Sequence, residues 1–417
     1  FGISIWIVAA CYMSVSTFAS EGAKPIRPND RVTMRGGDRN LLMISGDATI
    51  AEGRQGAFYQ MLQRFAPAWA RVDIIVPRPT VVAATTLFEN VFIHPSSTHK
   101  AFQWRHILQQ GLSLNTERRY DLMTSHDYGW HYNGLGTWLL HRRIGTPYVS
   151  EIHHVTGYPR SATIKEWIQG CLTRCYIRAI SNQVTAFRVP NALELPNLLR
   201  SLRVPPEKIL VLSSLYIDRN IFTPRPVAKQ YDVVFCGRAD SNKGVGILFQ
   251  AVAAVARTRP SLTVLMRTSG RQETSWRRLA ERLGIAARIT WRNWVDTPAE
   301  LASLYCASRM LVCTSYSEGG PRVTVEAMAC GIPVISTPVG VMPELIEHGR
   351  TGLLVDWSPK SVAVAIDRLL SDPDTAEAIG VGGCQRVTGF DREVVVDQYA
   401  AAYRQLADAS IAEAIRR

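Results

Sequence analysis

The sequence predicts an α/β protein built from two doubly wound domains, each around a mainly parallel sheet. Short apolar runs alternate with helix-compatible stretches along the chain, as expected for right-handed βαβ units. The alternation is interrupted at 219–230, where two prolines break regular structure, and then begins again. The length of 417 residues suffices for two domains of ordinary size, each with its own core.

The first domain is expected at residues 40–218. The stretch 57–65 favours a helix, and a loop with glycines at 53 and 56 precedes it. Residues 1–20 are apolar but diluted by serines and a threonine, and their length is marginal for a membrane span. We interpret 1–20 as a truncated signal-anchor or a result of where the chain was cut, and expect 21–39 to be disordered. The strands predicted for this domain are 41–44, 72–76, 91–93, 122–125, 148–152, 184–187 and 209–212.

The second domain is expected at residues 231–390, after a linker at 219–230. The tail, 391–417, has a helical pattern. Asp372 and Asp374 form an Asp-x-Asp pattern, which we interpret as a helix start and not as a metal clamp. The strands predicted here are 233–236, 262–266, 289–291, 310–313, 333–336 and 353–355.

The chain is basic, and the charge is uneven. The net charge is +12, and residues 1–210 hold 23 Lys and Arg against 14 Asp and Glu, which is +9. We expect this half to meet an anionic acceptor or an anionic membrane face. Nucleic acid is disfavoured, because no helix-turn-helix, zinc-finger or RNP signature is present. The eight scattered cysteines indicate reduced, buried thiols in a cytoplasmic protein, with no metal site at Cys171 and Cys175.

The segment 315–336 carries the strongest functional signal. Glu318 follows the predicted strand 310–313, in a loop at its carboxyl end, and Glu326 lies in the next helix. The amino end of that helix points free N–H groups at the same crevice. One acid can accept bonds from sugar hydroxyls and the other from ribose hydroxyls, while the helix start suits phosphate. The plain alternative is two solvated glutamates around an ordinary helix start.

Two cations follow the first strand of the second domain. Gly237 allows a tight exit from the strand 233–236, and Arg238 and Lys243 come just after it. Both side chains would reach the crevice that holds Glu318.

Over about residues 231–356 these motifs, with 294–301 and 337–355, resemble those of the retaining, GT-B-fold glycosyltransferases of group 1, also called family 4. The resemblance implies two Rossmann-like domains facing across a cleft, with the C-terminal helix packed back on the first domain. It implies that Arg238 and Lys243 hold the donor diphosphate, that Glu318 contacts the donor sugar, and that Glu326 contacts the ribose. The donor-binding residues implied are Gly56, Gly237, Arg238, Lys243, Trp294, Val295, Glu318, Gly319, Gly320, Arg322, Val323 and Glu326.

Three departures from the family pattern leave the donor open, and they lie at residues 319–322, 267–270 and 213–216. The family often has Gly-Phe-Gly where this chain has residues 319–322, so that Pro321 removes one N–H donor and Arg322 adds a charge. The glycine-rich loop at 53–56 is not a standard Gly-Gly pair. We expect Gly56 to face the donor and Arg54 to lie on the acceptor side; a flexible surface loop is the alternative.

Histidines cluster near the ends of the first-domain strands. His153 matches a histidine that the family often carries in its cleft, so we expect it to be catalytic with Glu318, Arg238 and Lys243. His154 is the alternative in register and a candidate on the acceptor side. Asp127 is a candidate base for the acceptor hydroxyl, or a helix cap. A structural histidine bonded to backbone is the alternative for His153.

Together these observations predict a retaining transferase that moves a sugar from a nucleotide-diphosphate sugar to a hydroxyl of a glycan or a lipid-linked glycan. No metal and no cofactor is expected, and nucleic acid is not an expected partner. We expect a cytoplasmic protein, with peripheral contact at the inner membrane face as a further hypothesis. The alternatives are a non-catalytic protein that binds sugar nucleotides and a GT-B relative such as an epimerase.

Overall fold

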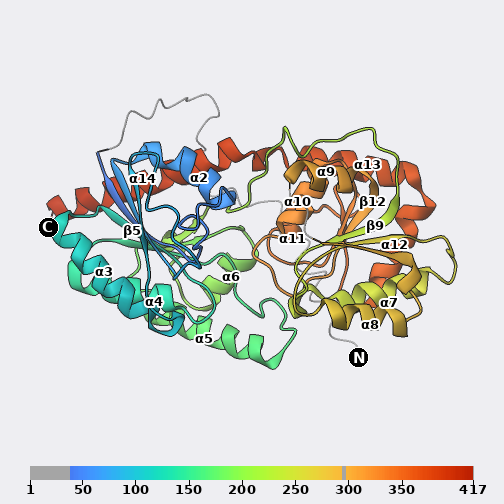
Figure 1. Cartoon of the computed structure of the whole chain (residues 1–417), viewed down its shortest axis with the longest axis horizontal. Coiled ribbons are helices and arrows are strands. Elements are labelled where there is room, and N and C mark those ends of the chain that lie inside the picture. The colour runs from blue at the N-terminus through green and yellow to red at the C-terminus, as the bar shows by residue number, and fades with distance from the viewer. Residues whose placement is uncertain (1–37, 294–296, 417) are drawn as a thin grey trace. The chain divides into compact units, whose positions relative to one another are not determined.

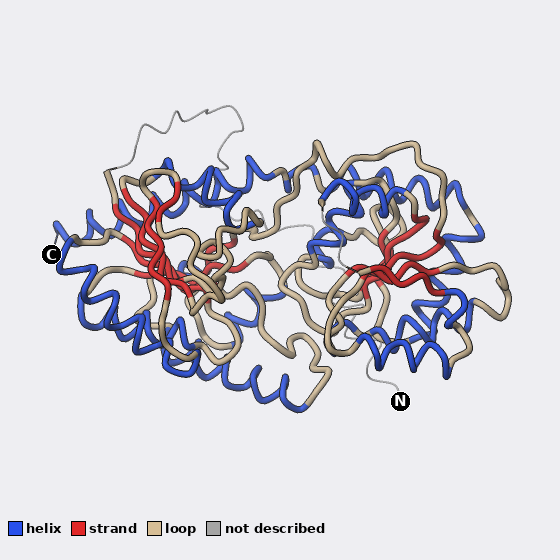
Figure 2. Tube along the Cα trace, viewed as in Figure 1, coloured by secondary structure: helices blue, strands red, loops and turns tan. Residues whose placement is uncertain are grey.

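The computed structural model describes residues 38–293 and 297–416, and these form two α/β sheet layers (Figures 1 and 2). The first sheet has eight strands in the order β3-β4-β2-β1-β5-β6-β7-β8, and all pairs are parallel except β3 with β4. Its strands are β1 Asn40–Ile44, β2 Arg71–Val76, β3 Thr86–Leu87, β4 Val91–Pro95, β5 Leu122–His126, β6 Tyr148–Glu151, β7 Ala186–Val189 and β8 Ile209–Val211. Its helices are α2 Ala57–Phe65, α3 Gln103–Glu117, α4 Tyr132–Ile144, α5 Ile164–Ile180 and α6 Glu194–Ser201.

The second sheet has six strands, all parallel, in the order β11-β10-β9-β12-β13-β14. Its strands are β9 Tyr231–Cys236, β10 Val264–Arg267, β11 Ile289–Arg292, β12 Ser308–Cys313, β13 Val334–Ser336 and β14 Leu353–Leu354. The helices are α7 Val245–Val255, α8 Glu273–Arg282, α9 Pro298–Cys306, α10 Arg322–Ala329, α11 Met342–Leu345, α12 Pro359–Ser371, α13 Pro373–Arg386 and α14 Arg392–Arg416. Asp372 accepts from the N–H of Thr375 at the start of α13, which confirms a helix cap there.

Alternating side chains of the strands build a core on each face of each sheet. In β1, Leu41 and Met43 join one buried cluster, whereas Leu42 and Ile44 join the cluster on the opposite face. In the second sheet the face alternates in the same way along β9. Helices cover both faces, as Figure 1 shows, so the predicted doubly wound α/β class is confirmed.

The predicted strands are all present, with ends shifted by at most two residues. β7 begins at Ala186, two residues later than predicted, because Val184 is buried in a turn and its N–H still bonds to the carbonyl of Ile180 at the end of α5. The strand β3 was not predicted. It is two residues long and antiparallel, so it has no apolar run that would mark it.

The last helix, α14, contributes to the core of the first domain. Val395, Val396, Tyr399 and Tyr403 are buried in the cluster that contains β1 and α2. The ring of Tyr399 lies 4.6 Å from that of Phe65 in α2. Figure 1 shows α14 running beside α2. The chain therefore completes its first core with residues that lie almost 200 positions beyond the first sheet.

Cysteine placement departs from the prediction in one respect. Cys236, Cys306, Cys313 and Cys330 are buried free thiols, as expected, but Cys175 is exposed on α5, and Cys171 and Cys384 are only partly buried. In the part of the chain that the structure describes, no helix combines the length and the apolarity that crossing a membrane requires.

Gly244 fixes the turn that carries Lys243 into α7. Its φ is +61°, and an added Cβ would lie 2.1 Å from the carbonyl oxygen of Thr314. We expect Gly244→Ala to lower the free energy of unfolding by about 3 kcal/mol, since it combines backbone strain with a clash against main chain. Urea unfolding of the variant measures this loss.

Gly284→Ala is the matched control for that prediction. Its φ is +68°, but no atom lies within 4 Å of an added Cβ, so only the backbone strain of about 1 kcal/mol remains. Equal losses in the two variants would contradict a role for the contact with Thr314.

Candidate functional site

An ion pair lies at the carboxyl edge of the second sheet. Glu318, in the loop after β12, pairs with the ammonium of Lys243, which precedes α7. The hydroxyl of Ser315 donates to the same carboxylate oxygen of Glu318 at 2.9 Å. The topology explains the meeting, because β9 and β12 are adjacent and their carboxyl ends lie at one edge.

The ion pair is largely shielded from solvent. The side chains of Lys243 and Glu318 are 17% and 16% exposed. Burial by itself would lower the pKa of Lys243, but the charge and hydrogen bond of Glu318 outweigh burial, so the pKa is raised. Lys243 therefore stays protonated, as a cation that binds an anion must.

The helix α10 begins beside Glu318. Pro321 occupies the position before its first turn, and the hydroxyl of Thr324 donates to the carbonyl of Pro321 at 2.6 Å. The amide N–H of Thr324 donates to the carbonyl of Pro321 at 3.0 Å, whereas N–H groups at the very start of a helix lack partners within it, which favours an anion. Val323 lies in this turn.

Glu326 lies further along α10 and is buried, with 6% exposure. The hydroxyl of Tyr305 donates to it at 3.1 Å, and the Arg322 guanidinium lies 3.4 Å away. Burial raises the pKa of Glu326, while the charge of Arg322 acts in the opposite direction.

Arg322 contacts a segment that follows the first sheet. Its guanidinium donates to the carbonyl of Tyr216 at 2.5 Å and lies 4.8 Å from the centroid of the Tyr216 ring. Arg322 thus joins the start of α10 to residue 216 and to Glu326. The sequence prediction had placed this charge at the donor.

Arg238 is much more exposed than Lys243. Its side chain is 76% exposed and its nearest ion-pair partner is Asp240, at 3.4 Å. Gly237 lies against Lys243: an added Cβ would be 3.5 Å from Cε of the lysine. Arg238 is therefore available to an incoming anion, whereas Lys243 must first leave Glu318.

Gly319 is in close contact with the end of β6. An added Cβ would lie 1.8 Å from the carbonyl oxygen of His153 and 3.1 Å from Cβ of His154. Gly320 is similarly tight against Leu215. Gly319 allows the loop with Glu318 to approach residues 153 and 154, and Gly320 allows it to approach Leu215.

The two neighbouring histidines have different surroundings. Nε2 of His153 lies 2.9 Å from Oε2 of Glu151. His154 is influenced by the charges of Glu318 and Lys243, and burial, the largest cause, lowers its pKa. Burial also lowers the pKa of His153, against the effect of Glu151. A Cβ added at Gly319, next to Glu318, would lie 3.1 Å from Cβ of His154, while the ring of His153 is bound to Glu151 of the first domain.

Glu151 is the centre of a buried polar network that the sequence did not reveal. Its side chain is fully buried, and its nearest cation is Arg188, at 2.9 Å. Burial would raise the pKa of Glu151, but the charges of Arg188 and His126 and several hydrogen bonds hold it well below the ordinary value. The network, called here the Glu151 cluster, consists of Glu151, Arg188, His126, His153, Thr124, Tyr399 and Tyr403.

The Glu151 cluster borders a cavity of about 310 Å³. Polar groups of His126, His153 and Arg188 line one part of it, and Phe58 and Met61 of α2 line another. The cavity thus combines cationic and hydrogen-bonding groups with an apolar wall. It lies at the carboxyl ends of the strands β5, β6 and β7, where ligands of open α/β sheets bind.

His126, Glu151 and His153 could together hold a metal ion, since their ligand atoms lie within 4.8 Å of one another. The donor set of two imidazoles and one carboxylate suits a transition metal. However, the guanidinium of Arg188 already binds the carboxylate oxygen that faces both imidazoles. A metal cation would have to sit beside that permanent positive charge, so the residues present fit a metal poorly.

Asp127 follows β5 and is buried, with 2% exposure. It accepts hydrogen bonds from the hydroxyls of Ser125, Ser150 and Tyr176, the first of these at 2.6 Å. The start of α4 has no side-chain cap, so Asp127 is not the helix cap that the sequence allowed. Burial raises the pKa of Asp127 to about 6, although the three hydroxyls act to lower it.

The raised pKa of Asp127 makes stability depend on pH. The folded state holds this proton more tightly than the unfolded state, so the contribution is complete below about pH 4 and is lost as the pH rises through about 6. Between these two pH values we expect the free energy of unfolding of wild type to fall by about 3 kcal/mol relative to that of Asp127→Asn, whose amide does not titrate. Urea unfolding across the pH range measures the difference. The exposed Asp374→Asn is the control, and parallel curves for Asp127→Asn and wild type would contradict the assignment.

The remaining predicted site residues that the structure describes make few contacts. Gly56 precedes the first turn of α2, with no atom within 4 Å of an added Cβ. Arg54 is exposed and pairs with Glu52 at 3.1 Å. Trp294 and Val295 lie outside the described residues.

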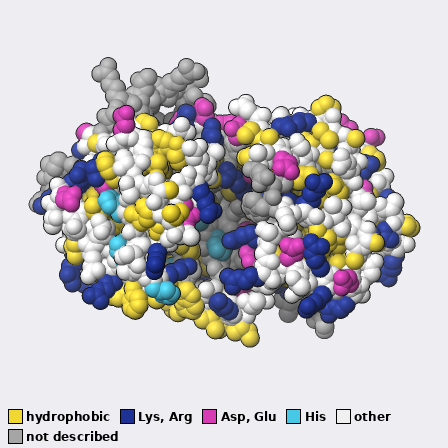
Figure 3. Space-filling model, viewed as in Figure 1, with side chains coloured by type: hydrophobic (Ala, Val, Ile, Leu, Met, Phe, Trp, Pro, Cys, Tyr) yellow, Lys and Arg dark blue, Asp and Glu magenta, His cyan; other side chains and the backbone are white. Residues whose placement is uncertain are grey.

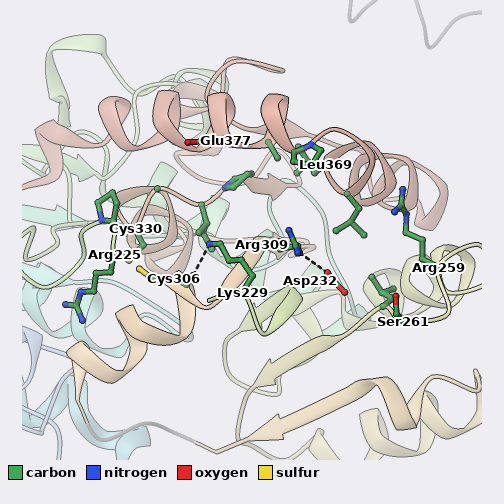
Figure 4. Close-up of a pocket in the computed structure, with 18 of the residues that line it drawn as sticks. Arg225, Lys229, Asp232, Arg259, Ser261, Cys306, Arg309, Cys330, Leu369 and Glu377 are labelled. Atoms are coloured by element: carbon green, nitrogen blue, oxygen red, sulfur yellow. Dashed lines mark hydrogen bonds and ion pairs between the residues drawn. The ribbon is translucent and has the colours of Figure 1, made fainter. Parts of the chain in front are cut away.

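A larger hollow, of about 830 Å³, lies at the other edge of the second sheet (Figure 4). It is lined by Asp232 and Arg309 near the amino ends of β9 and β12, and Figure 4 shows these two side chains pointing toward one another. Lys229 donates to two main-chain carbonyls beside it. Ligands of parallel sheets bind at the carboxyl edge, whereas this hollow lies at the amino edge.

Sequence reasoning missed Arg188, Ser315, Tyr399 and the role of Glu151. Ser315 had a usable signal, because it lies between the strand and Glu318. The other three come from β6, β7 and α14, and nothing local in the sequence brings these elements together.

Comparisons with known proteins agree with this arrangement. Residues 230–372 match the family model described as glycosyl transferases group 1. The chain is 29% identical over 299 residues to a D-inositol 3-phosphate glycosyltransferase of Segniliparus rotundus. The aligned region covers 67% of this chain and 65% of that protein. A protein of the same name from Thermobispora bispora is 27% identical over 316 residues, or 69% of this chain and 71% of the relative. The matched part thus spans about two thirds of the length of these relatives.

Solved structures share the arrangement of both sheets. Sucrose-phosphate synthase (tll1590) from Thermosynechococcus elongatus superposes with a TM-score of 0.73 at 21% identity, over 89% of this chain and all of that chain. Alr3699/HepE of Anabaena, solved with UDP-glucose, has a TM-score of 0.68 at 19% identity, over 88% of this chain and all of that chain. Residues 230–372, about a third of the chain, thus match the family of group 1 glycosyltransferases, and the two sheets have the GT-B fold.

Proposed function

We propose that this protein is a retaining glycosyltransferase that moves a sugar from a nucleotide-diphosphate sugar to a hydroxyl group without a metal ion. The observation that carries the proposal is the Lys243–Glu318 pair beside the first turn of α10. These groups supply a cation, a carboxylate and free amide N–H groups at one sheet edge. A sugar with a diphosphate needs all three.

The donor diphosphate would replace Glu318 as the ion-pair partner of Lys243. As the phosphates enter, Lys243 exchanges the carboxylate for a phosphate oxygen, and the exposed Arg238 closes from the outside. The carboxylate of Glu318 is then free to accept from sugar hydroxyls. This exchange makes ligand binding and the freeing of Glu318 one event.

The reaction breaks the bond between the anomeric carbon and the diphosphate oxygen. The leaving diphosphate keeps the electron pair, the acceptor oxygen bonds to the anomeric carbon, and the acceptor proton passes to a diphosphate oxygen. Lys243, Arg238 and the start of α10 would stabilise the negative charge that grows on the leaving group. These two cations supply the charge that a metal provides elsewhere, which supports a metal-independent reaction.

The cavity beside the Glu151 cluster is the proposed site of the acceptor. His126, His153 and Arg188 face it and favour an anionic or polyhydroxylated group. The relatives above are named as enzymes that act on D-inositol 3-phosphate, which is such a group. The apolar wall from α2 favours an acceptor that also has an apolar part, in agreement with a lipid-linked glycan.

A panel of UDP, GDP, ADP and dTDP, with and without EDTA, tests the donor site. A ligand at a hundredfold excess over its dissociation constant should stabilise the fold by about 2.7 kcal/mol. We expect one nucleotide to raise the melting temperature whether or not EDTA is present, and Lys243→Ala to remove most of that shift. A shift that EDTA abolishes would contradict metal independence, and no shift at all would favour a protein without this donor site.

A further inference from the structure

The helix α5 (Ile164–Ile180) presents a row of large apolar side chains to solvent. Ile164 is 79% exposed and Trp167 is 60% exposed, and Ile168 and Leu172 are each 43% exposed. Trp167, Ile168 and Leu172 follow Ile164 by three, four and eight residues, so all four side chains lie on one side of the helix. Figure 3 shows hydrophobic side chains gathered at the lower edge of the view, where Figure 1 places α5.

The opposite face of α5 is packed, so this exposure is not a sign of a loose helix. Gly170, Thr173, Ile177 and Ile180 are buried against the first domain. Isolated apolar residues on a surface are ordinary, but a continuous apolar stripe marks an interaction site. We call the exposed residues Ile164, Trp167, Ile168 and Leu172 the α5 stripe.

Cations accompany the α5 stripe. Within α5 the charged residues are Lys165, Arg174 and Arg178 against Glu166 alone. The Glu166 carboxylate is already engaged, since it accepts from the N–H of Ala162 at 2.7 Å and from the hydroxyl of Ser241 at 3.3 Å. The stripe is therefore an apolar surface in a positive field.

Further positive charge lies at the C-terminal end of α5. The guanidinium of Arg142 lies 5.4 Å from the ring centroid of Trp138, and the indole N–H of Trp138 donates to Gln183, three residues beyond the helix. Two copies of this face would bring like charges together. Self-association through it is therefore disfavoured, whereas an anionic surface is complementary.

We propose that the α5 stripe docks on the surface of an anionic membrane. The apolar side chains enter the boundary between headgroups and acyl chains, and Lys165, Arg174 and Arg178 remain at the level of the anionic headgroups. Trp167 has the amphipathic ring that interfaces favour. The docking does not depend on the proposed function, but it explains how that function would reach its acceptor.

The stripe is directly connected to the proposed acceptor site. Residues 155–163 alone separate α5 from His153 and His154 at the end of β6. Within this connection the N–H of Arg160 donates to the carbonyl of Tyr316, two residues before Glu318. A membrane held by α5 would thus lie close to His153, His154 and the loop that carries Glu318. This arrangement suits an acceptor whose reactive sugar is tethered to lipid.

Sedimentation with vesicles tests the proposal. The full chain is mixed with phosphatidylcholine vesicles, with or without phosphatidylglycerol. We expect wild type to sediment with the anionic vesicles, and less so as salt increases. We expect the triple variant Ile164→Ser, Trp167→Ser, Leu172→Ser to bind them at least about tenfold more weakly, because the lost apolar area supplies much of the affinity.

Matched variants keep the test specific. Val364→Ser with Val381→Ser removes two exposed valines of α12 and α13, and this variant should sediment like wild type. Residues 1–20 are the same in all variants, so they do not produce a difference. The nucleotide-induced thermal shift should be unchanged in the triple variant, which separates failure of docking from failure of the donor site.

Three results would overturn the proposal. The first is a wild type that stays in the supernatant with anionic vesicles. The second is a triple variant that sediments as much as wild type. The third, from light scattering, is a dimeric wild type and a monomeric triple variant, which would show that a second copy covers the stripe.

Discussion

Replacing Glu318 by alanine is expected to lower kcat by about 100-fold to 1000-fold while leaving nucleotide binding measurable. The carboxylate would act on the donor sugar in the transition state, whereas the nucleotide and phosphates are held by other groups. In the free protein Glu318 also neutralises Lys243 and accepts from Ser315. Its loss leaves Lys243 without its partner, so we expect nucleoside diphosphate to bind as tightly as before or more tightly.

The measurement is the initial rate of nucleotide release with an acceptor, combined with calorimetric binding of the nucleotide. Glu347→Ala is the matched control. Glu347 also belongs to an ion pair of the second domain, but its partner is Arg350, with side chains that are 60% and 75% exposed. Retained turnover in Glu318→Ala would refute the assignment of Glu318. Loss of nucleotide binding along with turnover would make Glu318 a structural residue.

The largest effect on stability is expected for Glu151→Ala, about 3–5 kcal/mol. The substitution leaves the guanidinium of Arg188 buried, with 5% of its side chain exposed, and without its carboxylate. It also removes the acceptor of Tyr399 and Tyr403, which donate to Glu151 at 2.9 and 2.8 Å. An uncompensated buried charge is among the costliest defects a core can contain.

Urea unfolding measures this loss, and two further variants apportion it. Tyr399→Phe removes one neutral hydroxyl and should cost about 1–2 kcal/mol. Glu151→Leu combined with Arg188→Met removes both charges and should be less destabilising than Glu151→Ala. A double variant as unstable as the sum of the two single variants would show that the pair does not act as a unit.

The sequence was sufficient for the features that local patterns encode. Apolar runs located the strands of both sheets, and the stretch 57–65 gave the bounds of α2. The proximity of Glu318 and Lys243 could be predicted because both residues follow strands of one parallel sheet, and parallel strands share a carboxyl edge. The prediction used topology, and topology is what alternating elements specify well.

Side-chain direction could not be obtained in this way. His153 and His154 are adjacent in the sequence, and nothing local shows that the ring of His153 bonds to Glu151 while Cβ of His154 lies against Gly319. Arg322 was expected at the donor, and the residues around it do not indicate that its guanidinium contacts the carbonyl and ring of Tyr216, more than 100 positions earlier. Asp127 lies in the expected place, yet three hydroxyls from three different segments surround it. Each of these outcomes depends on long-range packing.

Because α14 ends the chain, the first domain can complete its core only late in synthesis. A ribosome that has completed β8 at Val211 must add almost 200 residues before Tyr403 can reach Glu151. At ordinary elongation rates this takes roughly 10 to 40 s, during which Arg188 and Glu151 lack two of their partners. The first domain begins first but finishes last, so chaperones would meet the nascent chain there. For the same reason, a cut in the linker would separate the domain from part of its own interior.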